Sequence, residues 1–308
     1  MTRVVTAALL ALLVLLANPG RALGYCLETT CDPTKPEEAC ELDDAGCVLT
    51  GVPLHWTSSC VLFDVQADGS PKAGIDAGAA TDIASRAFST WLHADCGGGG
   101  PSLQIGTRGP VACDESRYND AGKNANVVIF RDEDWPYPDG IDTFGYTFVR
   151  FSTKTGEIYD ADVEINAERF ELATHGGDEG ADLQSILTHE FGHFLGIAHS
   201  EDDDATMRGD WDGVGTDLRT LTEDDASAIC ETYPPGRNAG TSCEPRHGFS
   251  GECFEPVAAP ASPACSSAAR VPANSALGWL AAWLALAFAR RRRGLNRAAR
   301  STTSEAGA

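Results

Sequence analysis

One stretch of the sequence is more informative about the fold and the site than any other. It reads His189-Glu190-Phe191-Gly192-His193-Phe194-Leu195-Gly196-Ile197-Ala198-His199. Four positions turn an α-helix by about 400°, so His189 and His193 project side by side, about 40° apart. Glu190 lies one residue further round the same helix. Gly196 can adopt a left-handed conformation that ends the helix. We therefore expect the chain to turn back there and to bring His199 to the other two imidazoles.

These side chains predict a catalytic zinc site. Three neutral imidazoles leave one of the four tetrahedral positions of zinc open, which is typical of catalytic rather than structural sites. Bound zinc lowers the pKa of its water toward about 7, and Glu190 is placed to accept that proton as a general base. The alternative interpretation is a buried helix whose histidines only fill the core.

The residues around this helix predict short strands and amphipathic helices. One predicted strand alternates Asp160, Asp162 and Glu164 on one face with apolar residues on the other. Asp182 is a candidate N-cap, and Thr222 with Asp225 has the spacing of a capping box. We expect helices at residues 75–92, 181–195 and 222–233, and strands at residues 60–66, 103–105, 126–130, 144–151 and 157–166.

The histidine stretch matches the pattern H-E-x-x-H-x-x-G-x-x-H of the metzincin zinc peptidases. Ser200, directly after the third His, resembles the matrixin branch, the family of the matrix metalloproteinases. The resemblance covers about residues 53–233. Its other segments are 221–225 with Ile229 and Tyr233, which are similar to the C-terminal helix of matrixins, and 145–147 and 156–166, which resemble secreted bacterial matrixin-like peptidases.

This resemblance implies an α+β, metzincin-like (zincin) catalytic domain. It would have a twisted mixed sheet with an antiparallel edge strand, an active-site helix and a smaller C-terminal subdomain. Met207, the only Met besides Met1, would form the turn beneath the zinc ligands. Residues 144–151 would be the edge strand that pairs with extended substrate. The implied activity is that of a metalloendopeptidase whose substrates are extracellular polypeptides. We expect the protein to be a monomer.

The sequence also departs from the family. It lacks the P-R-C-G-x-P-D segment whose Cys caps the zinc in matrixin proforms, so we expect no thiol-based latency. Arg208-Gly209-Asp210-Trp211 replaces the family's Pro-x-Tyr wall. Residues 130–165 contain no His, so we expect one catalytic Zn²⁺ and no structural one.

Two other functions are alternatives to peptidase activity. A non-catalytic, zinc-stabilised cell-surface binding module would not need Glu190 beside its three His ligands. A small-molecule metallohydrolase would need an enclosed pocket, whereas an open cleft with an edge strand suits peptides. The formal net charge of −22 argues against nucleic acid as a partner, because an acidic surface repels phosphates.

Both ends of the chain carry targeting signals. Arg3, an apolar stretch at 4–16 and Ala22-Leu23-Gly24 indicate a secretory signal peptide over residues 1–24; an uncleaved membrane anchor is the alternative. The apolar run 276–289, followed by Arg290 and three more Arg, is short for a membrane span. With Cys265 before it, the segment 276–293 resembles myxobacterial (MYXO-CTERM) sorting tails; a plain C-terminal anchor is the alternative. We expect a secreted protein that its tail retains at the cell surface or outer membrane.

Between these ends, composition indicates a Cys-rich segment at 25–52, the peptidase domain at 53–236 and a Pro/Ala/Ser-rich linker at 237–275. The chain has 11 Cys, and export favours disulfides. Setting Cys265 aside leaves an even set. We expect Cys96–Cys113 and Cys243–Cys253, with Cys230 joining the N-terminal cysteines to the third helix.

Two acidic loops are candidate Ca²⁺ sites, because hard cations take several oxygen ligands. The alternative is that both acidic loops are solvated and bind no metal. They are residues 201–204 and the group Asp132, Asp134, Asp139 and Asp142.

Overall fold

The structure is a computed structural model that describes residues 24–176 and 180–253. The predicted signal peptide, apart from Gly24, and the predicted sorting tail with Cys265 lie outside these residues. Within residues 24–176 and 180–253, no helix is long and apolar enough to cross a membrane.

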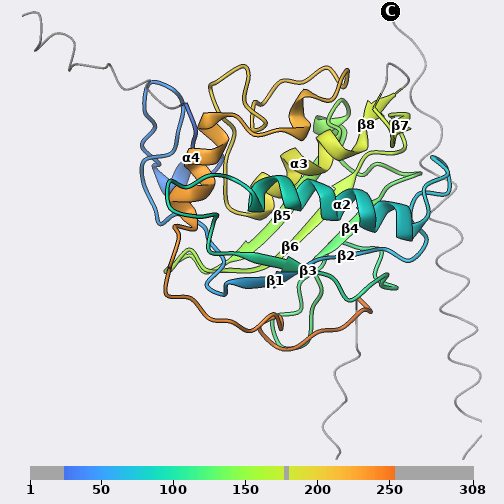
Figure 1. The fold of residues 1–308 in the computed structure, drawn as a ribbon, viewed down its shortest axis with the longest axis horizontal. Helices are drawn as coiled ribbons and strands as arrows, with labels where there is room; N and C mark the ends of the chain where they lie inside the picture. Colours follow the sequence, from blue (N-terminus) through green and yellow to red (C-terminus); the bar gives the residue numbers. More distant parts are fainter. Residues whose placement is uncertain (1–23, 177–179, 254–308) are drawn as a thin grey trace, which may run out of the picture. The chain divides into compact units, whose positions relative to one another are not determined.

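A four-stranded sheet forms the centre of the molecule (Figure 1). Its order is β2 (Asp64–Val65), β4 (Val127–Phe130), β6 (Ile158–Ile165) and β5 (Gly145–Phe151). The first three strands are parallel, and β5 pairs antiparallel with β6, with Thr147 opposite Val163. Every residue of β4 is buried, which agrees with its run of β-branched and aromatic side chains.

The strand expected at 60–66 is divided between two sheets. β1 (Cys60–Leu62) pairs with β3 (Gln104–Gly106), and β2 then joins β4. The chain changes partner here because the Phe63 N–H donates to Gly106 and the Asp64 N–H donates to Asn126. A short parallel pair, β7 (Leu172–Ala173) and β8 (Ala181–Asp182), precedes the central helix. Three 3₁₀ turns are η1 (Pro36–Glu38), η2 (Pro138–Gly140) and η3 (Asp217–Arg219).

Three helices begin at side-chain caps. α2 (Ala77–Leu92) begins after Asp76, which accepts from the Ala79 N–H at 2.8 Å. α3 (Leu183–Phe194) begins after Asp182, and α4 (Glu223–Thr232) begins with a capping box from Thr222 to Asp225. The Asp182 cap and the capping box confirm two predictions made from spacing alone.

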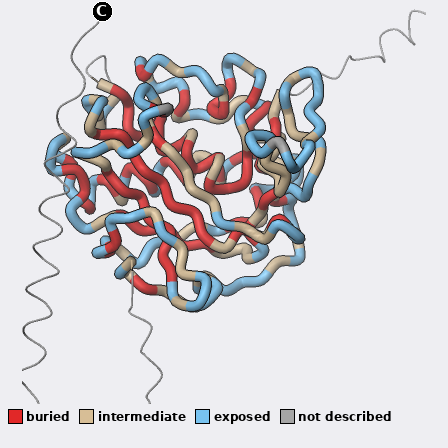
Figure 2. The backbone as a smooth tube through the Cα atoms, turned by 180° about the vertical axis from the view of Figure 1, so that it is seen from behind, coloured by how far each residue is buried: buried red, intermediate tan, exposed pale blue. Residues whose placement is uncertain are grey.

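The core lies between the sheet and the two helices α2 and α3. Phe88 stacks on Phe191 with ring centroids 3.5 Å apart, and Trp91 donates to the Thr188 carbonyl at 2.8 Å. Buried residues follow the strands and helices through the middle, and exposed residues occupy the surrounding loops (Figure 2). This packing fixes α3, which carries the histidine stretch, at the centre of the fold.

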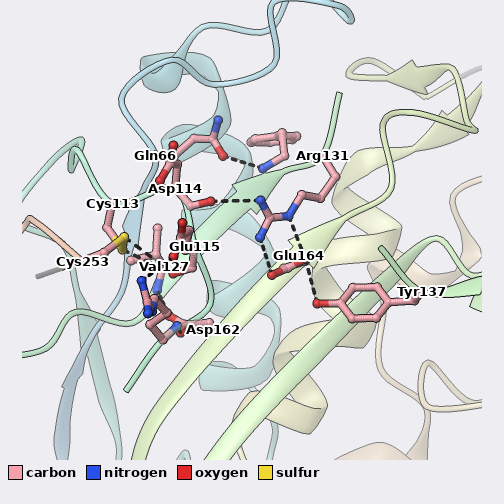
Figure 3. A network of polar contacts seen from close by, with 12 residues as sticks. Gln66, Cys113, Asp114, Glu115, Val127, Arg131, Tyr137, Asp162, Glu164 and Cys253 are labelled. Atoms are coloured by element: carbon pink, nitrogen blue, oxygen red, sulfur yellow. Dashed lines mark hydrogen bonds and ion pairs between the residues drawn. A yellow bond between two sulfur atoms is a disulfide. The ribbon is translucent and has the colours of Figure 1, made fainter. Parts of the chain in front are cut away.

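The opposite face of β6 buries its three acidic residues. Asp162 accepts from the Val127 and Arg117 N–H groups at 2.9 and 3.0 Å. Glu164 accepts two bonds from Arg131, at 2.8 and 2.7 Å, and one from the Tyr137 hydroxyl (Figure 3). The face predicted to be acidic is therefore also interior, because neighbouring loops cover it.

Five disulfides join the ten described cysteines, and our predicted pairs are wrong. The fold, and not spacing in sequence, decides which cysteines pair, because it brings the Cα atoms of the bonded cysteines to 4.6–5.9 Å. The N-terminal cysteines, apart from Cys60, pair among themselves, so Cys230 does not join them. The pairs are Cys26–Cys47, Cys31–Cys40, Cys60–Cys243, Cys96–Cys230 and Cys113–Cys253.

Residues 237–253, which composition assigned to a linker, are part of the same compact unit. Gly240 forms a bridge with Ser58, and Phe249 forms one with Asn124. Two of the disulfides also lie here. The Pro, Ala and Ser content of residues 237–275 predicts a linker, but backbone bridges and disulfides attach residues 237–253 to the rest of the fold.

Candidate active site

The helix α3 positions the first two histidines and the glutamate. Gly196 follows it with φ of +86°, which confirms the predicted left-handed turn. A Cβ at Gly196 would lie 2.3 Å from the carbonyl oxygen of Leu54, so only glycine fits. The Ile197 N–H then bonds back to Gly192 at 2.9 Å, and the chain returns toward the helix with His199.

The three imidazoles converge on one point. Their ring centroids are 4.9–5.2 Å apart, and Nε2 of His189 lies 3.3 Å from Nε2 of His199. Nδ1 of His189 lies 2.8 Å from the Thr206 carbonyl oxygen, and Nδ1 of His193 lies 2.9 Å from that of Ile197. A carbonyl only accepts, so both Nδ1 atoms carry the proton and both Nε2 lone pairs face the shared point.

This donor set fits a zinc ion. The ligand nitrogens of all three imidazoles lie within 4.8 Å of one another, and carbonyls that orient imidazoles as Thr206 and Ile197 do here are typical of metal ligands. Burial lowers the pKa of His189 well below its usual value. Desolvation of the ring, with His193 nearby, lowers the pKa of His199 to about 4, although the residue as a whole is exposed. Both therefore stay neutral, which is the form that binds metals.

Glu190 lies between α3 and β5. Its Oε2 accepts from the Thr147 hydroxyl at 2.7 Å, and burial raises the pKa of its carboxyl above the usual value. Gly145 makes room for it, since a Cβ there would lie 3.0 Å from Oε1. Thr147 was missed by sequence reasoning, because a single Thr in a strand carries no local signal of such a contact.

Met207 lies directly beneath α3. A Cβ at Gly192 would lie 2.1 Å from its sulfur, so the two residues are in close contact. The backbone of the Met207 turn is held by Asp225, whose carboxylate accepts from the N–H groups of Thr206 and Met207 at 2.8 and 3.0 Å. Asp225 thus links this turn to the start of α4.

A cavity of about 580 Å³ opens over these groups. Its lining at the Gly145 end of β5 includes the apolar residues Ile186, Trp211 and Leu218 and the polar residues Asp142 and Thr143. Its lining at the other end includes Glu28, Leu54 and Phe151. Sequence reasoning missed Glu28, since nothing local places an N-terminal residue beside α3.

The two predicted calcium loops do not assemble a ligand group among the described residues. The groups of three metal-binding side chains found there are the three histidines and the set Cys31, Glu38 and Cys40, whose cysteines form a disulfide. Asp132 instead accepts bonds from the Ser70 hydroxyl and the Lys72 N–H. Calcium binding stays a prediction.

Comparison with known proteins finds similarity to one family of metallopeptidases. Residues 110–234 match the family model described as Matrixin (Peptidase_M10). A curated relative, Matrilysin from Rattus norvegicus, is 28% identical over 101 residues, which are 33% of this chain and 35% of the relative. The chain thus spans about a third of the length of this relative. These similarities support a matrixin-like metallopeptidase in general terms.

Proposed function

We propose that the protein is a zinc-dependent endopeptidase that cuts extended polypeptides outside the cytoplasm. The observation that carries this proposal is the carboxylate of Glu190, held by Thr147 beside the point on which the three imidazoles converge. His189, His193 and His199 would hold Zn²⁺. When bound, that ion would polarise the substrate carbonyl and acidify a water molecule.

Residues of the chain would transfer the proton, position the carboxylate and bind the substrate. Glu190 accepts a proton from the attacking water and delivers it to the leaving amine. The Thr147 hydroxyl has one proton and lies 2.7 Å from Oε2 of Glu190 and 3.0 Å from the Glu190 carbonyl oxygen, so it fixes the carboxylate against β5. β5 is the last strand of its sheet and would pair with an extended substrate by β-augmentation.

We also propose the finer features of the architecture and targeting. The fold would be metzincin-like, with β5 as the antiparallel edge strand above the cleft and with Met207, His199 and α4 in a smaller C-terminal subdomain. The disulfides support export to an oxidising compartment. Export would depend on residues 1–24, and surface retention on the tail at 276–293.

The test separates metal binding from catalysis. Glu190→Ala should keep bound zinc but lose at least about 10² in the rate of peptide hydrolysis, the usual scale for loss of a general base. His193→Ala should lose both zinc and activity. Zinc is measured by elemental analysis of the purified full chain, and hydrolysis with casein and fluorogenic peptides. A Glu190→Ala variant that cuts casein at the unaltered rate would refute the mechanism. A zinc-loaded protein that cuts no peptide would favour the surface binding module.

A further inference from the structure

The Cys-rich N-terminal segment, residues 25–52, forms part of the cleft. The Ala198 N–H donates to the Cys26 carbonyl at 3.0 Å, and the Glu28 N–H donates to Gly196 at 3.0 Å. The Leu54 N–H then donates to the Glu28 carbonyl at 2.8 Å. The backbone of Glu28 is therefore held between the turn after α3 and Leu54.

The carboxylate of Glu28 faces the cleft beside the metal-binding group. It lies 3.5 Å from Nδ1 of His193, a nitrogen whose proton already bonds to Ile197 at 2.9 Å. The Glu28 side chain remains 40% exposed. Within residues 24–176 and 180–253, no Lys or Arg is found in an ion pair with it. Arg208, which also lines the cavity, is paired with Asp217 at 2.5 Å.

Glu28 and the apolar lining lie at opposite ends of the cleft. The His55 N–H donates to the Gly156 carbonyl at 2.9 Å, which places Leu54 and Glu28 beside the hairpin that follows Phe151. Trp211 lies beside Phe144, with ring centroids 5.2 Å apart, at the other end of β5. An extended chain along β5 therefore passes the apolar residues, the three histidines and then Glu28.

We propose that Glu28 determines specificity by binding a Lys or Arg side chain of the substrate. This side chain would lie on the opposite side of the scissile bond from the residue that enters the apolar end. The inference rests on the proposed peptidase function. Among the described residues no Lys or Arg pairs with Glu28, and its one ion-pair contact is with the imidazole of His193, so the exposed side of the carboxylate can bind a cation. Arg208 is the one Lys or Arg among the described lining residues, and it is paired with Asp217. The carboxylate thus makes the N-terminal segment a part of the substrate site.

The experiment compares matched peptides on the full chain. A cleavage-site profile of the unaltered protein first identifies the position at which basic residues are enriched. Peptides that carry Arg, Gln or Glu at this position are then measured for kcat/KM with the unaltered protein, Glu28→Gln and Glu28→Lys. Glu41→Gln is the control, because it removes the same charge from the same segment at an exposed site outside the cavity. Binding of the same peptides to the Glu190→Ala variant, with and without Glu28→Gln, supplies a readout that does not depend on turnover.

We expect the unaltered protein to prefer Arg over Gln by about fivefold, the upper range for a solvent-exposed ion pair. Glu28→Gln should abolish this preference, Glu28→Lys should favour the Glu peptide, and Glu41→Gln should change nothing. A uniform fall in kcat/KM for all three peptides after Glu28→Gln would mean that Glu28 only orients His193, and would overturn the proposal while leaving the peptidase function intact. If no peptide is cut or bound, both proposals fail.

Discussion

Two buried aspartates, Asp182 and Asp160, have pKa values that their surroundings shift in opposite directions. Asp182 accepts from the Ser185 N–H at 2.8 Å and pairs with Arg219, whose Nε lies 2.8 Å from Oδ1. Burial opposes ionisation of Asp182, but these bonds outweigh it, and the pKa is lowered. Asp160 is equally buried, and within the described residues its Oδ1 has no hydrogen-bond partner. Burial, with the nearby Asp162 carboxylate, raises its pKa well above the usual range.

Asp160→Asn should stabilise the protein at pH 8 and have little effect at pH 4. A group whose pKa is raised by folding favours the folded state while protonated, and this contribution is lost as the pH rises through the folded pKa. Asn is neutral throughout, so its advantage grows with pH, to about 1 kcal/mol or more. Thermal unfolding at the two pH values measures it. An equal change in Tm at both would contradict the argument.

Asp182→Asn should change the stability of the protein in the opposite direction, by destabilising it at neutral pH. A group whose pKa is lowered by folding stabilises the folded state above its unfolded pKa, and that stability is lost as the pH falls through the folded pKa. We therefore expect Asp182→Asn to cost about 2 kcal/mol at pH 7, where it leaves the partly buried Arg219 without its ion-pair partner, and much less at pH 3. The same unfolding series records both variants.

The candidate site could be predicted only where its parts are local in sequence. His189, Glu190 and His193 share a helix, so helical periodicity is enough to place them together. Thr147 and Glu28 meet α3 from a strand and from the N-terminal segment, and their positions depend on tertiary packing that no local pattern contains.

The turn after α3 is tightly constrained by its backbone conformation and by its contact with Leu54. Gly196→Ala combines a left-handed backbone with a Cβ 2.3 Å from the Leu54 carbonyl oxygen. We expect a large loss of stability and of bound zinc, because His199 follows this turn. Zinc per chain and Tm are the measurements.

Gly236→Ala is the matched control for this variant. Gly236 also has positive φ, +74°, but a Cβ there meets nothing within 4 Å. This change should cost only about 1–2 kcal/mol for the left-handed conformation and should leave zinc content unaltered. Equal losses in the two variants would show that backbone strain, rather than the contact with Leu54, dominates at Gly196.

Elements themselves were predicted well where a cap or a period marks them, and less well where partners change. The N-caps Asp182 and Thr222 correctly placed the starts of α3 and α4. The division of residues 60–66 between two sheets could not be predicted, because it depends on which distant strands lie beside Phe63 and Asp64.

For the whole molecule, the disulfides were the poorest part of the prediction. Composition indicated that ten cysteines would pair and that the tail cysteine would not take part, and the ten described cysteines do pair. Their partners are set by the fold: Cys96 and Cys230 are separated by 134 positions, and Cys113 and Cys253 by 140. Spacing in sequence carries no information about such pairs.

The covalent attachment of residues 237–253 has a practical consequence for anyone who expresses a shorter piece of this protein. A recombinant fragment that stops at residue 236 would lack Cys243 and Cys253, the partners of Cys60 and Cys113. Each molecule would then carry two orphan thiols, and we expect it to run as cross-linked dimers and larger species on a non-reducing gel. A fragment that continues through Cys253 should run as a monomer on the same gel, and an identical pattern for the two would contradict the observed pairing.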